Sequence, residues 1–345
     1  MRILFLGENW YGSCARACCY ALRRMGHDVR DVDVQTFSPQ WRRKSSRAVA
    51  TLVFPRIISE FNAYVLQAAA IFRPEVLIAF KGNLVRPETL RTIRQSGVRT
   101  YNYYPDGSAF VHRSLIPESL GEYDCVFYTH RHLPGDVEKR VKLRKAIYLP
   151  HGYDPELHHP YPISKEEQAQ LGHDVNFIAT YFPSKERLLA ALVRAMPEVD
   201  LKIWGERWSD RCTSEELAPF IAGTGLYGSS YCKAIGASRI NLGVMTGTME
   251  GSSSGDQTTT RSYEIPACGG FMLHERNSEV LELFEEGKEI ACFSSAEEMA
   301  DKIRYYLTNP GEREMVAQAG YRRCVPAYSY DTRVAEILRY DRERV

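Results

Sequence analysis

Residues Asp256 to Leu273 read DQTTTRSYEIPACGGFML and contain a complete transition from a loop through a helix to a strand. Threonine is favoured where helices begin, so the run that starts at Thr258 predicts a helix start. The pair Gly269 and Gly270 ends that helix, and the apolar residues that follow are typical of a buried strand. Glu264 stands between apolar neighbours on the helix, where a carboxylate needs hydrogen-bonding partners.

The same alternation of helix and strand extends on both sides of this stretch. In the second half we expect strands at 175–180, 201–204, 240–244, 271–273 and 290–293, with helices at 185–196, 231–238, 297–307 and 312–325. Short apolar strands that alternate with helices form a parallel sheet covered on both faces. The second half therefore predicts a doubly wound α/β domain.

The first half repeats the pattern, with strands expected at 2–6, 28–34, 74–82, 98–103 and 123–128. A loop containing Gly12 and Ser13 follows the first strand, at the edge where doubly wound sheets bind ligands. The loop lacks the G-x-G-x-x-G pattern, so a dinucleotide site is not predicted. Asp106 follows the strand 98–103 and reaches the same edge. An aspartate before glycine is equally typical of a plain turn, and both interpretations stay open.

Prolines and glycines cluster between Leu149 and Pro162, where the apolar periodicity lapses. This composition predicts a linker, so we expect a first domain at 1–150, a second at 151–330 and a final helix at 331–345. No stretch offers about 18 uninterrupted apolar residues, and therefore no membrane span is predicted. The nine cysteines show no metal-binding or disulfide spacing, which favours a cytoplasmic protein with reduced thiols and no metal.

Charge is divided unevenly along the chain. Residues 1–149 carry 23 Lys and Arg against 13 Asp and Glu, a net charge of +10, and the remainder carries 21 against 30, a net charge of −9. A basic patch at Trp41 to Arg47 adds to the first half. The asymmetry indicates that the first domain faces an anionic partner, such as a membrane surface or a polyanion. Ordinary solvated surface charge is the alternative.

The central stretch also carries a family resemblance. The letters at Arg261, Tyr263 to Ala267 and Cys268 to Phe271 match the pattern R-x-F/Y-E-I-P-A-C-G-G-F. This pattern resembles the group 1 retaining glycosyltransferases, in particular the branch related to the spore maturation protein CgeB. The P-x-G-x-D letters at Pro150 to Asp154 resemble the hinge of the same enzymes. The resemblance implies the GT-B architecture, with two Rossmann-like domains facing a cleft and a C-terminal helix that packs back on the first domain.

The resemblance implies a nucleotide-sugar donor bound by the second domain without a metal or another cofactor. Glu264 then accepts hydrogen bonds from the ribose, and Asp256 stands where the wider family has a glutamate beside the donor sugar. Lys185 and Arg187 both follow the first strand of the second domain, where the family binds phosphate, and which of the two acts stays open. Asp256, Asp106 and Arg187 are the expected catalytic residues.

Other donor-binding residues are expected around these. A diphosphate suits the positive end of the helix at Thr259 and Thr260, and Arg261 offers a guanidinium fork to it. Three residues match patterns of the CgeB-like branch and are expected near the base: Gly205, Tyr231 and Lys233. By the same resemblance the loop of Gly12 and Ser13 borders the donor phosphates and the acceptor.

The expected function is therefore hexosyl transfer from a nucleoside diphosphate sugar, in particular a UDP-sugar, with retention of configuration. The acceptor is expected on the basic first domain, as a lipid-linked or membrane-surface glycan or a nucleic acid, with the protein cytoplasmic or peripheral at the membrane. One alternative is a glycosyltransferase that acts on modified bases in DNA. Another is a catalytically silent nucleotide-sugar-binding or spore-coat protein, which the aspartate at 256 permits.

Overall fold

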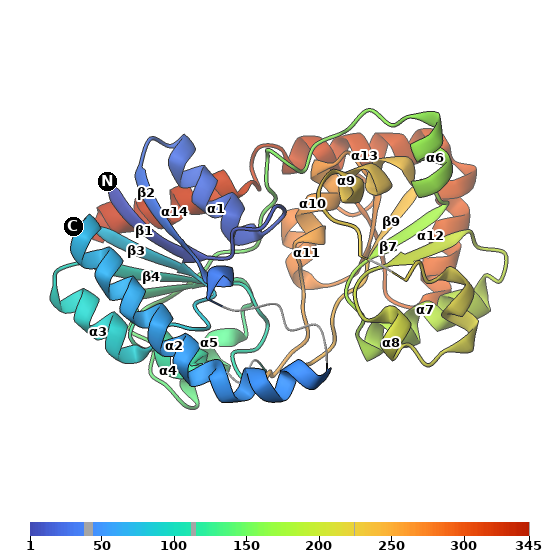
Figure 1. The fold of residues 1–345 in the computed structure, drawn as a ribbon. Coiled ribbons are helices and arrows are strands. Elements are labelled where there is room, and N and C mark those ends of the chain that lie inside the picture. The colour runs from blue at the N-terminus through green and yellow to red at the C-terminus, as the bar shows by residue number, and fades with distance from the viewer. Residues whose placement is uncertain (38–43, 112–114, 224, 345) are drawn as a thin grey trace. The chain divides into compact units, whose positions relative to one another are not determined.

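The computed structural model describes residues 1–37, 44–111, 115–223 and 225–344, and for 44–53 it describes the backbone alone. The chain forms two compact units (Figure 1), which are described separately. Unit 1 comprises Met1–Pro150, Thr248–Ser254 and Arg333–Val345, and unit 2 comprises His151–Gly247 and Gly255–Thr332. The basic patch predicted at 41–47 lies outside the residues whose side chains are described.

Unit 1 contains a six-stranded, wholly parallel sheet in the order β2-β1-β3-β4-β5-β6. Its elements are β1 (Arg2–Gly7), α1 (Cys14–Arg24), β2 (Asp28–Asp33), the short 3-10 helix η1 (Val34–Thr36), α2 (Lys44–Phe72), β3 (Val76–Phe80), α3 (Pro87–Gln95), β4 (Arg99–Tyr104), α4 (Ile116–Leu120), β5 (Cys125–Tyr128), α5 (Leu133–Glu138), β6 (Ala146–Tyr148) and most of α14 (Tyr330–Arg344). Helix α2 continues through Pro55. A proline inside a helix removes one hydrogen bond and can be accommodated without ending the helix.

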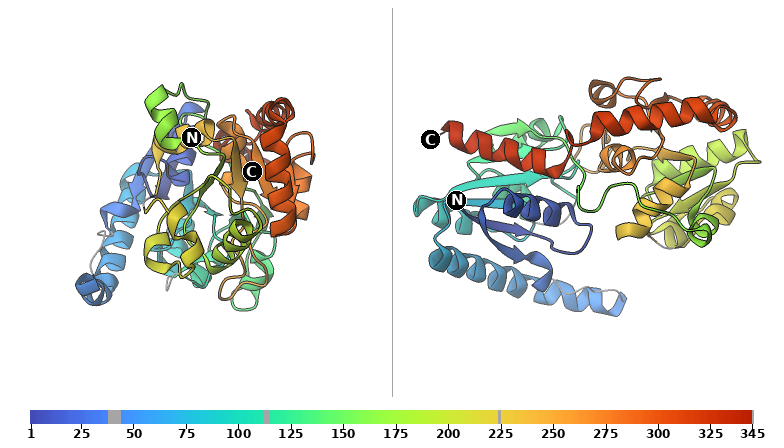
Figure 2. Two further views of the ribbon diagram at one scale, coloured as in Figure 1. Left: turned by 90° about the vertical axis from the view of Figure 1, so that its right-hand side faces the viewer. Right: turned by 90° about the horizontal axis from the view of Figure 1, so that it is seen from above.

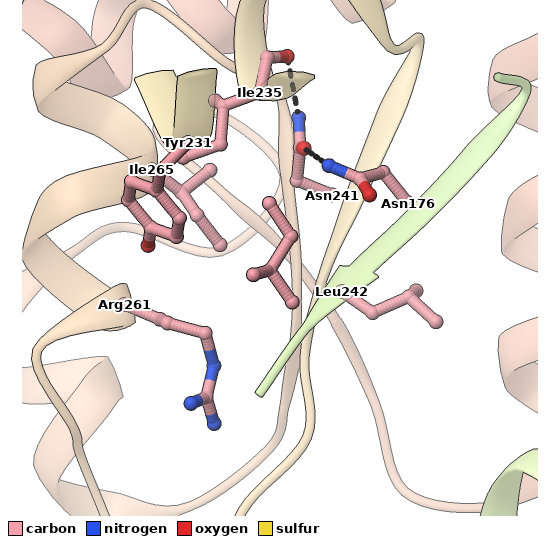
Figure 3. A pocket seen from close by; sticks show the side chains of 8 residues that line it. Asn176, Tyr231, Ile235, Asn241, Leu242, Arg261 and Ile265 are labelled. Carbon is pink, nitrogen blue, oxygen red and sulfur yellow. Dashed lines mark hydrogen bonds between the residues drawn. The ribbon is translucent and has the colours of Figure 1, made fainter. Parts of the chain in front are cut away.

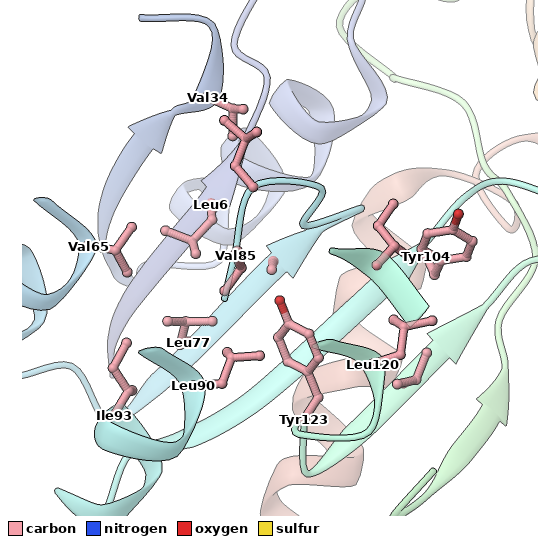
Figure 4. Packing of buried hydrophobic residues seen from close by; sticks show 14 of the residues in the cluster. Leu6, Val34, Val65, Leu77, Val85, Leu90, Ile93, Tyr104, Leu120 and Tyr123 are labelled. Atoms are coloured by element: carbon pink, nitrogen blue, oxygen red, sulfur yellow. The ribbon is translucent and has the colours of Figure 1, made fainter. Parts of the chain in front are cut away.

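Side chains alternate between the two faces of the unit 1 sheet, because successive strand residues point in opposite directions. On one face Leu6 and Leu77 pack toward Val65 of α2 and Leu90 of α3 (Figure 4). On the other face lies α14, and the sheet separates it from α2 (Figure 2). Apolar residues on both faces give this unit its own core.

Helix α14 is fixed to unit 1 by rings and by one buried carboxylate. The Tyr340 ring meets those of Tyr101 and Phe127 edge-on, with centroids 5.9 and 5.6 Å apart. Asp341 accepts hydrogen bonds from Arg99 Nε at 2.5 Å and from Tyr101 Oη at 2.7 Å. The C-terminal residues therefore contact strands that lie more than 200 positions earlier in the sequence.

Unit 2 contains a five-stranded, wholly parallel sheet in the order β11-β10-β9-β7-β8. Its elements are α6 (Lys165–Leu171), β7 (Val175–Ile178), α7 (Pro183–Ala195), β8 (Leu201–Trp204), α8 (Trp208–Arg211), the 3-10 helix η2 (Glu215–Phe220), α9 (Gly228–Ala237), β9 (Ile240–Gly243), α10 (Arg261–Ala267), β10 (Met272–Glu275), α11 (Ser278–Leu283), β11 (Ala291–Phe293), α12 (Ala296–Thr308) and α13 (Pro310–Cys324). Two parallel α/β sheets are what the sequence predicts.

Each sheet has one point at which the strand order reverses direction. In unit 1 this point lies between β1 and β3, and in unit 2 it lies between β7 and β9. Open parallel sheets bind ligands outside the carboxyl ends of the two strands at such a point, because the loops there diverge. The loops after β7 and β9 are therefore where a ligand of unit 2 is expected.

The segment Thr248–Ser254 leaves unit 2 after β9 and packs with unit 1. The Ser108 hydroxyl donates to Glu250 O at 2.6 Å, and the Ser253 backbone N–H donates to Asp136 Oδ2 at 2.8 Å. The boundaries expected from the sequence place this segment in the second domain. Its hydrogen-bonding partners are distant in sequence, so no local pattern indicates that it groups with unit 1. Among the described residues no helix is both long enough and apolar enough to cross a bilayer.

Gly205 ends β8 in a position that only glycine fits. Its φ is +140°, and a Cβ built there would lie 1.9 Å from Ala179 O, a backbone atom that has no room to move. We expect Gly205→Ala to lower the free energy of unfolding by about 3 kcal/mol, the upper range for overpacking. Thermal unfolding of the variant checks this against Gly311→Ala, whose Cβ meets nothing within 4 Å and whose stability should not fall.

Candidate functional site

Two basic side chains meet at the carboxyl edge of the unit 2 sheet. Lys185 lies in the first turn of α7, directly after the loop that follows β7, and Arg261 begins α10, after the loop that follows β9. The two are close enough for the charge of Arg261 to lower the pKa of Lys185, and Asp256 is close enough to oppose it. The β7/β9 reversal point of unit 2 thus carries two cations and one carboxylate.

Lys185 is buried, with 4 % of its surface exposed, although lysine is seldom buried without an anionic partner. Its Nζ donates to Thr180 O at 3.2 Å. Burial, followed by the repulsion of Arg261, lowers the pKa of Lys185 to about 7. A lysine in this state gains a full positive charge when an anion approaches, because the anion restores the stabilisation that burial removed.

Arg261 is held mainly by backbone and by a ring. Its Nη2 donates to Val244 O at 2.9 Å, and the guanidinium lies 5.8 Å from the centre of the Phe177 ring. Its Nε is buried and has no hydrogen-bonding partner among the described residues. Burial lowers the pKa of Arg261, although the group stays charged at neutral pH. Within the part of the chain that the structure describes, neither Lys185 nor Arg261 forms an ion pair with a carboxylate.

The threonines before α10 do not act as the sequence predicted. Thr260 has helical dihedral angles and its side chain makes no capping hydrogen bond, so the helix begins one residue later, at Arg261. The Thr259 N–H instead donates to Ser262 Oγ at 3.1 Å. The hydroxyls of Thr258 and Thr259 are buried and have no partner within the described chain, which leaves them available to a polar ligand.

Glu264 lies one turn further along α10 and is only 8 % exposed. Its Oε2 accepts a hydrogen bond from the Tyr231 hydroxyl at 2.7 Å, and His158 Nε2 lies 3.7 Å from Oε1. Burial and the neighbouring Glu264 raise the pKa of Tyr231 well above its usual value, so the phenol keeps its proton and donates it. The Tyr231 hydroxyl therefore orients one oxygen of the carboxylate, and His158 lies near the other.

A small cavity lies behind these residues, and Tyr231 and Arg261 both border it (Figure 3). Its free volume of about 10 Å³ is about that of a single water. Asn176 of β7 donates to Asn241 Oδ1 at 3.1 Å, and Asn241 donates to Ile235 O at 3.1 Å. This amide pair ties β7, β9 and α9 together beneath the site, so the cavity supports the site and is too small for a nucleotide.

Three of the predicted donor residues lie elsewhere in unit 2. Arg187 is exposed on the outer face of α7, where it lines a separate surface depression with Arg194. Side chains two positions apart on a helix point in different directions, so α7 turns Lys185 inward and Arg187 outward. Lys233 pairs with Glu167 of α6 at 2.5 Å. Gly205 has its packing role at the end of β8.

The predicted residues of unit 1 have local partners. Ser13 is the N-cap of α1, and its hydroxyl accepts from the Ala15 N–H at 3.1 Å. Gly12, with φ of +102°, forms the turn before it. Asp106 pairs with Lys81 Nζ at 2.9 Å, and Lys81 has an unusual φ of +66°. These residues lie at the β1, β3 and β4 ends of their own sheet.

Two histidines that lie near α10 are not among the site residues expected from the sequence. His274 is fully buried, its Nδ1 meets Glu275 O at 2.7 Å and its Nε2 meets Ser262 Oγ at 2.9 Å. Burial lowers the pKa of His274 to about 4, so it is neutral and supports the start of α10. His158 reaches Glu264 from a loop 106 positions earlier in the sequence, a separation that no local pattern reveals.

Comparison with known proteins is informative about the second half of the chain. Residues 184–339 match the protein family described as "Glycosyl transferase-like". This range contains Lys185, Tyr231, Asp256, Arg261 and Glu264. No curated protein matches the chain by sequence.

Solved structures match over nearly the whole chain. A sucrose-phosphate synthase from Thermosynechococcus elongatus has a TM-score of 0.68 and 13 % identity, over 99 % of this chain and 98 % of that one. Anabaena Alr3699/HepE, in complex with UDP and glucose, has a TM-score of 0.65 and 13 % identity, over 99 % and 100 %. A UDP-N-acetylglucosamine 2-epimerase described as putative, from Listeria monocytogenes, has a TM-score of 0.57 and 10 % identity, over 98 % and 94 %.

The chain therefore has the two-domain parallel α/β fold of the GT-B glycosyltransferases, as the sequence predicted. Sequence identities this low establish the fold alone. Since a transferase and an epimerase described as putative share the fold, the fold does not decide between their activities.

Proposed function

We propose that the protein is a glycosyltransferase that takes its sugar from a UDP-sugar bound by unit 2. The observation that carries the proposal is a pair of cations, the buried Lys185 and the half-buried Arg261, which lack a carboxylate ion pair among the described residues. They stand at the β7/β9 reversal point, within the range that matches the glycosyl transferase-like family. A buried charge without a partner is costly, and a diphosphate supplies the missing negative charge.

In this proposal the diphosphate lies between Lys185 and Arg261, and the free hydroxyls of Thr258 and Thr259 donate to its oxygens. When the bond from the sugar to the diphosphate breaks, negative charge grows on the leaving phosphate. Fixed cations stabilise that charge more strongly in a buried site than in water. The ribose hydroxyls donate to Glu264, which accepts hydrogen bonds through both oxygens. Lys185 and Arg261 thus take the electrostatic role, and we propose that no metal is needed.

The remaining parts of the proposal concern the sugar and the acceptor. Asp256 is near both cations, its N–H donates to Thr246 O at 2.9 Å, and we propose that it contacts the donor hexose. Transfer with retention is proposed, with the departing phosphate helping to deprotonate the acceptor hydroxyl. The net charge of +10 in residues 1–149 supports an anionic acceptor bound by unit 1.

The test is turnover of a panel of UDP-sugars, with release of UDP measured with and without EDTA. We expect slow hydrolysis of one donor in the absence of an acceptor, unchanged by the chelator. The Lys185→Met variant should lose it, and Arg187→Ala, which alters an exposed residue outside the cation pair, should keep it. Conversion of UDP-N-acetylglucosamine into its 2-epimer without UDP release would instead identify an epimerase. Tight UDP binding without turnover of any donor would identify a silent binding protein.

A further inference from the structure

We propose that His158 is a positioning residue that orients Glu264 for the ribose hydroxyls of the nucleotide. The inference rests on the proposed UDP-sugar site and assigns part of its selectivity to a residue outside the residues 184–339. Three observations carry it: the hydrogen bond that fixes the His158 tautomer, the position of its other nitrogen, and the rigid turn on which it stands.

The tautomer of His158 follows from its backbone partner. The Asp154 N–H donates to His158 Nδ1 at 3.0 Å, so Nδ1 is an acceptor and carries no proton. In a neutral imidazole the proton then resides on Nε2. Nε2 is the atom that lies 3.7 Å from Glu264 Oε1. The ring therefore presents an N–H, and not a lone pair, to the carboxylate.

The turn that carries His158 is held firmly in place. Asp154 Oδ1 accepts from the Glu156 N–H at 3.0 Å, and Asp154 O accepts from the His158 N–H at 2.7 Å. The Cys232 thiol donates to Leu157 O at 3.3 Å, which ties the turn to α9 beside Tyr231. His158 is 6 % exposed and has little freedom to rotate away. A buried ring with a fixed tautomer on a fixed turn is suited to orienting a neighbour.

Glu264 therefore has a donor on each oxygen: Tyr231 on Oε2 at 2.7 Å, and His158 facing Oε1. The distance of 3.7 Å is too long for a formed hydrogen bond, and such contacts often tighten when the ligand binds. With its plane set by these two groups, the carboxylate directs its remaining lone pairs toward neighbouring hydroxyls. A vicinal diol, as in ribose, is the ligand that this geometry favours.

Two amide variants separate the functions of the two ring nitrogens. An asparagine amide reaches about as far as Nδ1, so His158→Asn keeps an acceptor for the Asp154 N–H and removes the donor that faces Glu264. A glutamine amide reaches about as far as Nε2, so His158→Gln keeps that donor. The measurement is the ratio of the dissociation constants of 2′,3′-dideoxy-UDP and UDP, by calorimetry. This ratio reports recognition of the ribose hydroxyls, and a general loss of packing does not change it.

We expect the wild-type protein to prefer UDP by at least about tenfold, since hydrogen bonds to a charged group are strong. His158→Asn should lower this preference by about fivefold or more, and His158→Gln should largely restore it. An unchanged ratio in a folded His158→Asn protein overturns the proposal while leaving the UDP site in place. If the wild-type protein does not bind UDP, the proposed function fails and the positioning role fails with it.

A measurement on the wild-type protein covers the case in which His158→Asn does not fold. Long-range ¹⁵N–¹H spectra of histidine-labelled protein report which ring nitrogen carries the proton. We expect the Nε2–H tautomer for His158, with an Nε2 resonance that shifts when UDP binds. An Nδ1–H tautomer, or an Nε2 resonance indifferent to saturating UDP, would overturn the role assigned here.

Discussion

Replacing Lys185 by methionine is expected to weaken UDP binding by about 100-fold at pH 7 and to abolish its dependence on pH. Methionine keeps most of the buried volume of the side chain, so the loss reflects charge. Hydrogen bonds that involve a charged group contribute about 1.5–3 kcal/mol, and about 1.4 kcal/mol corresponds to a tenfold change in affinity. Calorimetric titration of UDP into both proteins measures the effect.

The pH dependence in the wild-type protein has a definite sign. The pKa of Lys185 is lowered to about 7, so in the free protein the ammonium form is lost progressively as the pH rises above 7. The terminal phosphate of UDP, with its last pKa near 6, is already largely ionised at pH 7. Binding must therefore draw a proton onto Lys185, and the dissociation constant should rise by about 50-fold between pH 7 and pH 9.

Proton uptake tests the same point independently. Titrations at pH 8 in buffers of different ionisation enthalpy should show close to one proton taken up per UDP bound, about 0.9 if free Lys185 titrates near pH 7. The Lys185→Met variant should take up none. Lys233→Met is the matched control, because Lys233 is paired with Glu167 and should leave both affinity and proton uptake unchanged. A pH-dependent affinity in Lys185→Met would assign the titration to another group.

Replacing Glu264 by glutamine is expected to weaken UDP binding by about 30-fold and to remove the preference for ribose over dideoxyribose. Glutamine is the conservative choice, because its carbonyl oxygen can still accept from the Tyr231 hydroxyl, while its NH2 group then faces the Nε2–H of His158. What it lacks is the second acceptor oxygen and the charge that the two ribose hydroxyls require. Dissociation constants of UDP and of 2′,3′-dideoxy-UDP give the result directly.

The two variants should fail in different ways if the phosphates and the ribose occupy separate places. Glu264→Gln should retain the pH dependence that belongs to Lys185, and Lys185→Met should retain the ribose preference that belongs to Glu264. Loss of both properties in either variant would mean that the substitution disturbs the whole site. Retention of the ribose preference in Glu264→Gln would remove that residue from the proposed site.

Local sequence patterns predicted much of the fold. The apolar runs after Met1 and before Gly205 form parallel strands. Buried strands consist of a few consecutive apolar residues, so a short stretch of sequence is enough to predict them. The prediction failed where the partners are distant. The grouping of Thr248–Ser254 with unit 1 depends on Ser108 and Asp136, more than 100 positions away.

Only part of the candidate site can be predicted from contiguous sequence, for the same reason. Glu264 and Arg261 belong to one contiguous pattern, whereas the choice between Lys185 and Arg187 required the rotation of α7 about its axis. Threonine propensity predicted a side-chain cap at the start of α10, and the Thr260 side chain makes no such hydrogen bond. Nearby, the Thr259 N–H donates to Ser262 Oγ instead. The sequence does not predict a role for His158, because the proposed role depends on the turn at Asp154 folding against α9 and α10.

The most direct measurement is a crystal structure of the protein with UDP. The account predicts diphosphate oxygens within about 3.2 Å of Lys185 Nζ and of the Arg261 guanidinium, with the ribose hydroxyls on Glu264. A nucleotide bound at any other place on the chain, or Lys185 and Arg261 still directed only at Thr180 O and Val244 O in the complex, would contradict it.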